Sequence, residues 1–126
     1  MTRPPTIIAI AAIFGLISVI AGAAGTHALR DTLDAGALNT FETAARFQMY
    51  HALALLAVGL LSMRWQARVL TASAALFTLG TILFSGSLYI LALTGIGIFG
   101  AVAPVGGLCL MVGWASLILA AFVSRG

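Results

Sequence analysis

Four long apolar runs contain none of the chain's charged side chains, and this pattern limits the fold more than any other feature. The runs lie at about Ile7–Gly25, Met49–Met63, Val69–Leu93 and Ala101–Val123. A bilayer core about 30 Å thick is crossed by a helix of about 20 mainly apolar residues. Three runs have about that length, and the second reaches it if its helix starts upstream, near residue 44. The sequence therefore predicts an all-α, four-span transmembrane helix bundle with its second span at about 44–63.

Composition excludes a water-soluble domain. The chain is 62% hydrophobic and 7% charged, whereas an ordinary soluble domain is about 45–50% apolar and about 25% charged. Its 126 residues leave no room for a soluble module beside four spans, so we expect one integral membrane domain over residues 1–126. The net charge of +3 comes from six scattered arginines, which is typical of membrane-flanking charge. We therefore expect the lipid bilayer, and no nucleic acid, as a partner.

The first apolar run has a second interpretation. Arg3, the stretch up to Ile20 and the small residues Ala21–Ala23 also have the three-part pattern of a cleavable signal peptide. The run stays apolar through Gly25, however, which favours an uncleaved first span.

The arginines predict the orientation, because cytoplasmic loops carry an excess of Lys and Arg. Four lie on one predicted side and two on the other, which places both termini in the cytoplasm of a bacterial inner membrane. The first group is Arg3, Arg64, Arg68 and Arg125, and the second is Arg30 and Arg46.

The segment Thr26–Arg46 contains all three acidic residues, Asp31, Asp34 and Glu42. Either aspartate could cap a helix that begins near Asp34. We expect a longer polar loop here, or an amphipathic helix that lies on the membrane surface.

Small residues recur at intervals of three and four in three of the spans. Such rows let helices approach closely in lipid and favour left-handed crossings near +20°. They predict a compact bundle, although part of one row could instead serve a homodimer. The rows are Ala11, Gly15, Ser18, Gly22 and Gly25; Ala74, Thr78, Thr81 and Ser85; and Gly106, Cys109, Gly113, Ser116 and Ala120.

Polar side chains concentrate between His27 and His51. We expect both histidines toward the same membrane face, where two imidazoles could ligate a haem iron or a metal. No third ligand follows at a recognisable spacing, so we expect hydrogen-bonded histidines with no metal and no cofactor. Glu42 and Arg46 are four residues apart and predict an ion pair, with Tyr50 one turn further on.

In the third span, two serines and a tyrosine predict interhelical hydrogen bonds, with ligand contact as the alternative. No Ser–His–Asp set, metal cluster or phosphate loop is present, which predicts a protein with no catalytic residues that is not an enzyme. The candidate polar or ligand site comprises His27, Glu42, Arg46, Gln48, Tyr50, His51, Ser85, Ser87 and Tyr89.

Several segments together resemble a known family. Gly22–Arg30 is similar to its Gly-Ala-Phe-Gly-Ala-His-Ala-Leu-Lys signature, and Phe41–Leu56 to its central block; Phe84–Gly95 and Pro104–Gly107 match two further blocks. The chain resembles the small bacterial YgdD/YwdK-like membrane proteins (domain of unknown function 423), which are related to the eukaryotic transmembrane protein 256 group. The resemblance implies a multi-pass inner-membrane protein with an attached first span and no settled activity.

These observations leave three functions open. The first is a non-enzymatic accessory or structural protein, in a larger membrane complex or a homo-oligomer. The second is a binder of a small hydrophobic ligand (a lipid, a quinone or haem) at the polar site near the outer face. A small transporter ranks last, because no charged group lies inside the predicted apolar runs.

Overall fold

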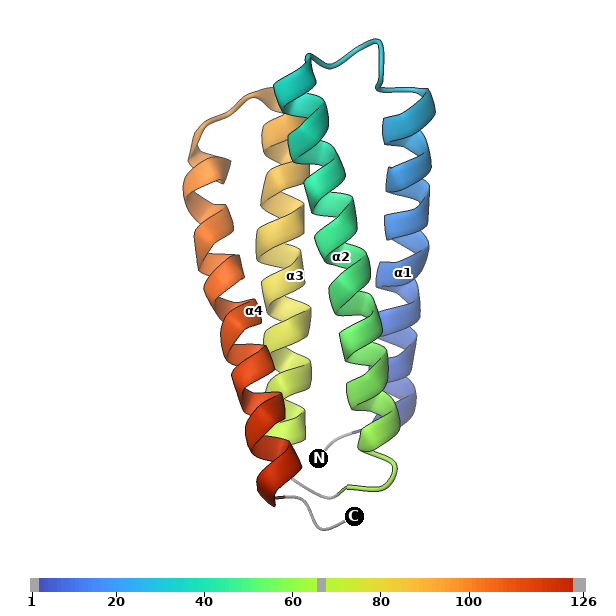
Figure 1. Ribbon diagram of the computed structural model, residues 1–126, viewed down its shortest axis with the longest axis vertical. Helices are drawn as coiled ribbons and strands as arrows, with labels where there is room; N and C mark the ends of the chain where they lie inside the picture. The colour runs from blue at the N-terminus through green and yellow to red at the C-terminus, as the bar shows by residue number, and fades with distance from the viewer. Residues whose placement is uncertain (1–2, 66–67, 124–126) are drawn as a thin grey trace.

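The computed structural model describes residues 3–65 and 68–123, which form four helices side by side (Figure 1). The helices are α1 (Pro4–His27), α2 (Ala35–Leu61), α3 (Arg68–Thr94) and α4 (Ile98–Val123). Each is long and apolar enough to cross a membrane. Neighbouring helices run antiparallel, so α1 begins and α4 ends at the same end of the bundle, where α2 is followed by α3 (Figure 1). The predicted all-α four-span architecture is confirmed.

Helix α2 begins at Ala35, well before the predicted start near residue 44. Asp34 is its N-cap, and the carboxylate accepts a hydrogen bond of 2.8 Å from the backbone N–H of Ala37. Phe41 is buried in this first part of α2, where its ring packs edge-on against Tyr89 of α3. The expected long loop or separate surface helix was therefore wrong. The link is only residues 28–34, because the cap and this packing extend the helix to Asp34.

The main interfaces join helices that are consecutive in the sequence: α1 with α2, α2 with α3, and α3 with α4. Helix α2 is the most buried of the four and α1 the least. The largest fully buried side chains come from the two central helices, Leu55 and Val58 of α2 and Leu70 and Phe77 of α3. The outer helices α1 and α4 therefore have wide faces directed toward lipid.

Helices α3 and α4 approach each other closely along a row of glycines. A Cβ added at Gly106 would collide with the backbone nitrogen of Phe84, and one added at Gly113 would lie 2.9 Å from the ring of Phe77. Gly80 of α3 has the same role from the other side, since its added Cβ would lie 2.7 Å from Leu110. Close packing of this kind replaces the hydrophobic effect as the attraction between helices in lipid.

Only some of the small residues in the predicted row on α1 lie at a helix interface. Ala11, Ser18 and Gly25 are buried, and an added Cβ at Gly25 would lie 3.3 Å from Phe41 of α2. Gly15 and Gly22 have open space in place of their missing side chains. The α1–α2 interface therefore follows every second member of the row.

The substitution Gly106→Ala should destabilise the bundle, because the new methyl meets backbone that cannot move independently of α3. Overpacking of this kind typically costs about 1–3 kcal/mol. The measurement is reversible unfolding in mixed micelles. The control is Gly86→Ala, since Gly86 of α3 has open space where its Cβ would stand. Equal stability of the two variants would contradict the close approach at Gly106.

Candidate functional site

The side-chain amide of Gln48 joins three helices in the interior of the bundle. Gln48 of α2 is buried. Its Nε2 donates a 2.8 Å hydrogen bond to the backbone carbonyl of Phe14 in α1, and its Oε1 accepts one of 2.8 Å from the hydroxyl of Tyr89 in α3. Both ends of the amide are therefore satisfied by protein groups, as an apolar environment requires.

One turn further along α2, His51 is bound from both sides. Its Nδ1 lies 2.7 Å from the carbonyl oxygen of Phe47, and Nε1 of Trp114 in α4 lies 3.1 Å from its Nε2. An indole N–H can only donate a hydrogen bond. Nε2 therefore accepts, and Nδ1 carries the hydrogen that is donated to Phe47. These contacts select the neutral Nδ1–H tautomer and join α2 to α4.

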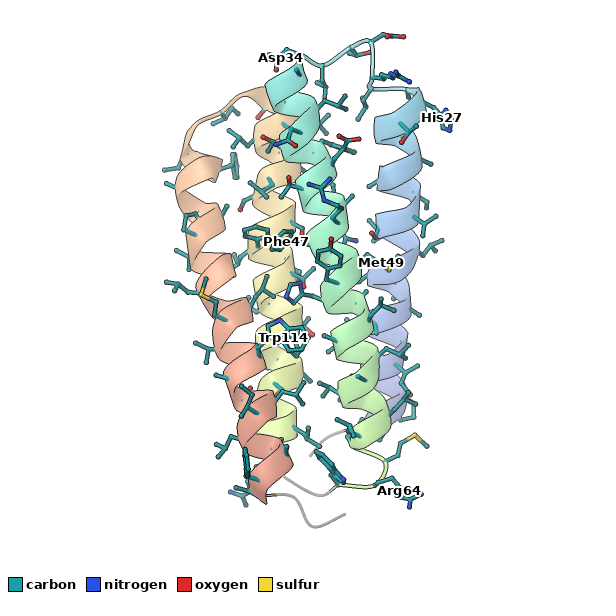
Figure 2. All side chains as sticks on the ribbon, in the orientation of Figure 1. His27, Asp34, Phe47, Met49, Arg64 and Trp114 are labelled. Carbon is teal, nitrogen blue, oxygen red and sulfur yellow. The ribbon has the colours of Figure 1, made fainter. Side chains whose placement is uncertain are left out.

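Aromatic rings surround this histidine. The His51 ring centroid lies 5.8 Å from that of Phe77 and 5.9 Å from that of Trp114, and these two rings meet edge to face at 5.1 Å. Phe47 stacks on the imidazole from the same helix. Figure 2 shows Trp114 midway along α4, directed toward α2. The imidazole thus lies in a mainly aromatic environment near the middle of the bundle.

Serine hydroxyls form three further links between helices. Ser18 of α1 donates to the carbonyl of Ala45 (2.7 Å), and Ser85 of α3 donates to that of Ala44 (2.8 Å). Ser73 of α3 and Ser116 of α4 lie 2.7 Å apart. Small neighbours allow these short side chains to reach the next helix, so the predicted interhelical role of Ser85 and Tyr89 is what the structure shows.

The two histidines lie far apart, contrary to the expectation that they share a membrane face. His27 is exposed at the end of α1, as Figure 2 shows. His51 lies about 24 Å along α2 from Ala35, at a rise of about 1.5 Å per residue. The prediction failed because it started the second span too late and so placed His51 near an end.

The expected ion pair between Glu42 and Arg46 is also absent from the described residues. Nη2 of Arg46 instead donates to Oγ1 of Thr43, at 3.2 Å. Glu42 is partly buried, while Arg46 and Tyr50 are exposed. Ser87 is buried, and no side-chain hydrogen bond from it is found within residues 3–65 and 68–123.

The analysis of the sequence missed Trp114. Tryptophan in membrane proteins is typical of the interface, but Trp114 stands in the middle of an apolar run. A polar N–H at that depth needs an acceptor, and this signal could have pointed to His51. The sequence analysis placed Thr81 only in a row of small residues. In the structure its Oγ1 is fully enclosed and has no hydrogen-bond partner in the described residues.

The arrangement binds helices together rather than presenting reactive groups. Gln48, His51, Ser85 and Tyr89 are directed at other protein groups. In the described part of the chain, no three His, Cys, Asp or Glu side chains lie close enough to hold a metal ion. We therefore regard this site as a polar cross-link of the bundle.

Removal of the Tyr89 hydroxyl should weaken the bundle by about 1 kcal/mol. Interhelical hydrogen bonds in membrane proteins average about 0.6 and reach about 1.7 kcal/mol, and Tyr89→Phe also leaves Oε1 of buried Gln48 without its donor. The measurement is unfolding of the variant in micelles. Tyr50→Phe is the matched control, because this exposed tyrosine donates no hydrogen bond within the described residues. A loss as large for Tyr50→Phe would contradict the assigned role of Tyr89.

The hydrogen bonds of His51 predict its tautomer. Nitrogen-15 NMR of the ring should show hydrogen on Nδ1 and a lone pair on Nε2, whereas exposed His27 should show the tautomer mixture of a solvated imidazole. Trp114→Phe should remove the hydrogen bond at Nε2 and shift that resonance alone. Finding the hydrogen of the unmodified protein on Nε2 would contradict the Trp114 contact.

Comparisons with known proteins give one consistent family. A family described as "Protein of unknown function (DUF423)" matches residues 21–107. A UPF0382 membrane protein of Staphylococcus saprophyticus is 44% identical over 91% of this chain and 95% of its own length. The UPF0382 inner membrane protein YgdD of Escherichia coli strain K12 is 39% identical over 88% of this chain and 85% of its own. No solved structure matches the chain. On this extent of similarity, the chain belongs to the DUF423 family of membrane proteins.

Proposed function

We propose that this protein is a non-enzymatic accessory protein of the bacterial inner membrane that associates with a larger membrane complex through one face of α2. The location follows from the similarity to an Escherichia coli protein named as an inner membrane protein. The absence of free reactive groups at the polar cross-link supports a role without catalysis. The proposal therefore concerns the outer surface of the bundle, where other membrane proteins could bind.

The observation that carries this proposal is the position of Arg46. Ser18, which bonds to Ala45, lies about 14 Å from the His27 end of α1 at about 1.5 Å per residue. The backbone of Arg46, the residue after Ala45, therefore lies well inside the apolar layer. Its side chain is exposed on the outside of the bundle. Within the described residues its guanidinium has only the Thr43 hydroxyl as a side-chain partner.

An arginine at such a depth is costly unless it is paired. Insertion scales give about 2.5–3.5 kcal/mol for Arg at the centre of a transmembrane helix. A carboxylate or a set of backbone carbonyls from a partner helix would offset this cost and use the several donors of the guanidinium. The exposed Arg46 thus favours a partner that offers acceptors inside the membrane.

Aromatic side chains beside Arg46 supply the apolar part of such a contact. Tyr50 is 52% exposed and Phe47 37% exposed on α2, and Trp114 of α4 is 45% exposed. Phe47 contacts both Tyr50 and Phe84 through ring centroids 5.7 and 5.1 Å apart, so it is held in place. Aromatic residues with an arginine among them are the composition typical of protein–protein binding centres.

The charge distribution supports an orientation with both termini in the cytoplasm. Arg3, Arg64 and Arg68 lie at the end of the bundle where α1 begins, whereas Arg30 lies at the other end and Arg46 within α2. Arg125 falls outside the described residues. An excess of arginine marks the cytoplasmic side.

The structure gives no comparable support to a ligand at the polar site. Both ring nitrogens of His51 and both ends of the Gln48 amide are already bound. His27, the other candidate haem ligand, lies at the far end of α1 (Figure 2).

The proposal predicts a partner that depends on Arg46. Protein expressed at native level and released in mild detergent should co-purify with a defined membrane polypeptide, seen by native mass spectrometry. Arg46→Gln should lower recovery of that polypeptide by about tenfold, equivalent to about 1.4 kcal/mol. Arg30→Gln, which removes an exposed arginine from the 28–34 link, should leave it unchanged. A bare monomer, or a subunit carrying only a small molecule, would overturn the accessory role.

A further inference from the structure

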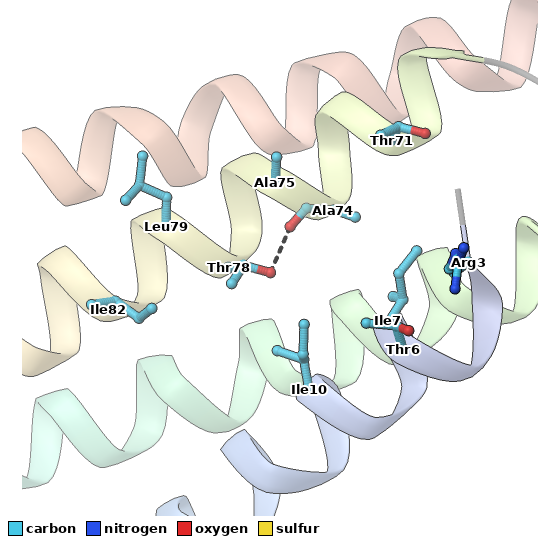
Figure 3. A pocket seen from close by; sticks show the side chains of 10 residues that line it. All are labelled: Arg3, Thr6, Ile7, Ile10, Thr71, Ala74, Ala75, Thr78, Leu79 and Ile82. Carbon is cyan, nitrogen blue, oxygen red and sulfur yellow. Dashed lines mark hydrogen bonds between the residues drawn. The ribbon is translucent and has the colours of Figure 1, made fainter. Parts of the chain in front are cut away.

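A groove runs between α1 and α3 at the end of the bundle where α1 begins. It has a volume of about 540 Å³ and is lined by residues of these two helices (Figure 3). It exists because α1 and α3 each pack against α2, which leaves a furrow between them. Ile7 and Ile10 line it from α1, and Ala75, Leu79 and Ile82 line it from α3.

The length of the groove is apolar. Thr78, which lies along it, donates its hydroxyl to the carbonyl of Ala74 in its own helix at 2.7 Å (Figure 3). This hydroxyl is therefore satisfied. From Thr71 to Ile82 the groove covers about 16 Å of α3 at about 1.5 Å per residue. One leaflet of a bilayer core about 30 Å thick has about the same depth.

The mouth of the groove differs from the rest. Arg3, Thr6 and Thr71 lie together at this end (Figure 3). Arg3 precedes α1 as its N-cap residue, and its exposed side chain has no ion-pair partner among residues 3–65 and 68–123. A guanidinium without an ion-pair partner in this part of the chain, beside the Thr6 hydroxyl, is a set that binds phosphate oxygens.

Charge over the whole end of the bundle points to an anionic occupant. Arg64 and Arg68 lie here with Arg3, and Arg68 begins α3 one turn before Thr71. The three acidic residues of the chain lie elsewhere, at positions 31, 34 and 42. The charged side chains described at this end therefore attract anionic headgroups.

We infer that this groove binds one anionic phospholipid, with the phosphate at Arg3 and Thr6 and one acyl chain along the apolar furrow between α1 and α3. The basic mouth selects the headgroup charge, and the furrow, one leaflet deep, accepts a chain that enters from the same leaflet. The site is separate from the Arg46 face of α2, which lies nearer the opposite end. It therefore stands independently of the proposed accessory role.

The test is a lipid titration of the full chain in dodecyl maltoside micelles, followed by native mass spectrometry. Dioleoyl phosphatidylglycerol is the probe, and zwitterionic dioleoyl phosphatidylcholine is the comparison. The unmodified protein should retain one phosphatidylglycerol and bind phosphatidylcholine at least fivefold more weakly, as expected when single arginines act on headgroup charge. Equal retention of the two lipids would overturn the inference.

Two variants locate the site. Arg3→Gln should weaken phosphatidylglycerol binding about fivefold, and Ala75→Phe should abolish retention by filling the furrow. Their controls are Arg30→Gln at the opposite end and Ala101→Phe, which changes an exposed alanine of α4. Far-ultraviolet circular dichroism checks that each variant is folded. Unchanged binding in both Arg3→Gln and Ala75→Phe, or equal losses in the controls, would show that the lipid does not occupy this groove.

Discussion

The hydrogen bonds of Gln48 show the constraint on which the bundle depends: a buried polar group in a membrane has only the protein to satisfy it. The amide binds a backbone carbonyl of α1 and a hydroxyl of α3, so three helices have a fixed register at one level. His51 and Trp114 add α4 at the next turn. Helix α2 is thus hydrogen-bonded to each of the other three helices, and it is also the most buried of the four.

The helix interfaces differ in how far they depend on close packing and how far on interhelical hydrogen bonds. The α3–α4 interface rests mainly on glycines that bring the two backbones together, supplemented by the Ser73–Ser116 contact. The α1–α2 interface has fewer close approaches and relies on Ser18 and Gln48. The hydrogen bonds of Ser18 and Gln48 therefore act together with the close approach at Gly25 to define which residues of α1 and α2 face each other.

Much of the fold was predictable from the sequence, because length and hydropathy nearly determine a membrane helix. The continuity of α2 was not. A helix capped near Asp34 was expected, but the span was placed by apolar content and began near residue 44, whereas one helix runs from the Asp34 cap through the span, with Phe41 packed on Tyr89. That one error moved His51 from the middle of the bundle to its edge. Gln48, Ser85 and Tyr89 were identified as candidates from polarity alone, but their partners depend on helix rotation, which no local pattern supplies. Trp114 was missed because its position contradicts the interfacial preference of tryptophan.

The order of the interfaces has a consequence for biogenesis. Each main interface joins a helix to the one synthesised just before it, so every new span finds its neighbour already in the membrane. Contacts of low sequence separation form quickly and without long searches. These four helices can therefore assemble in the order of translation, and α4 joins the other three when Trp114 reaches the imidazole of His51.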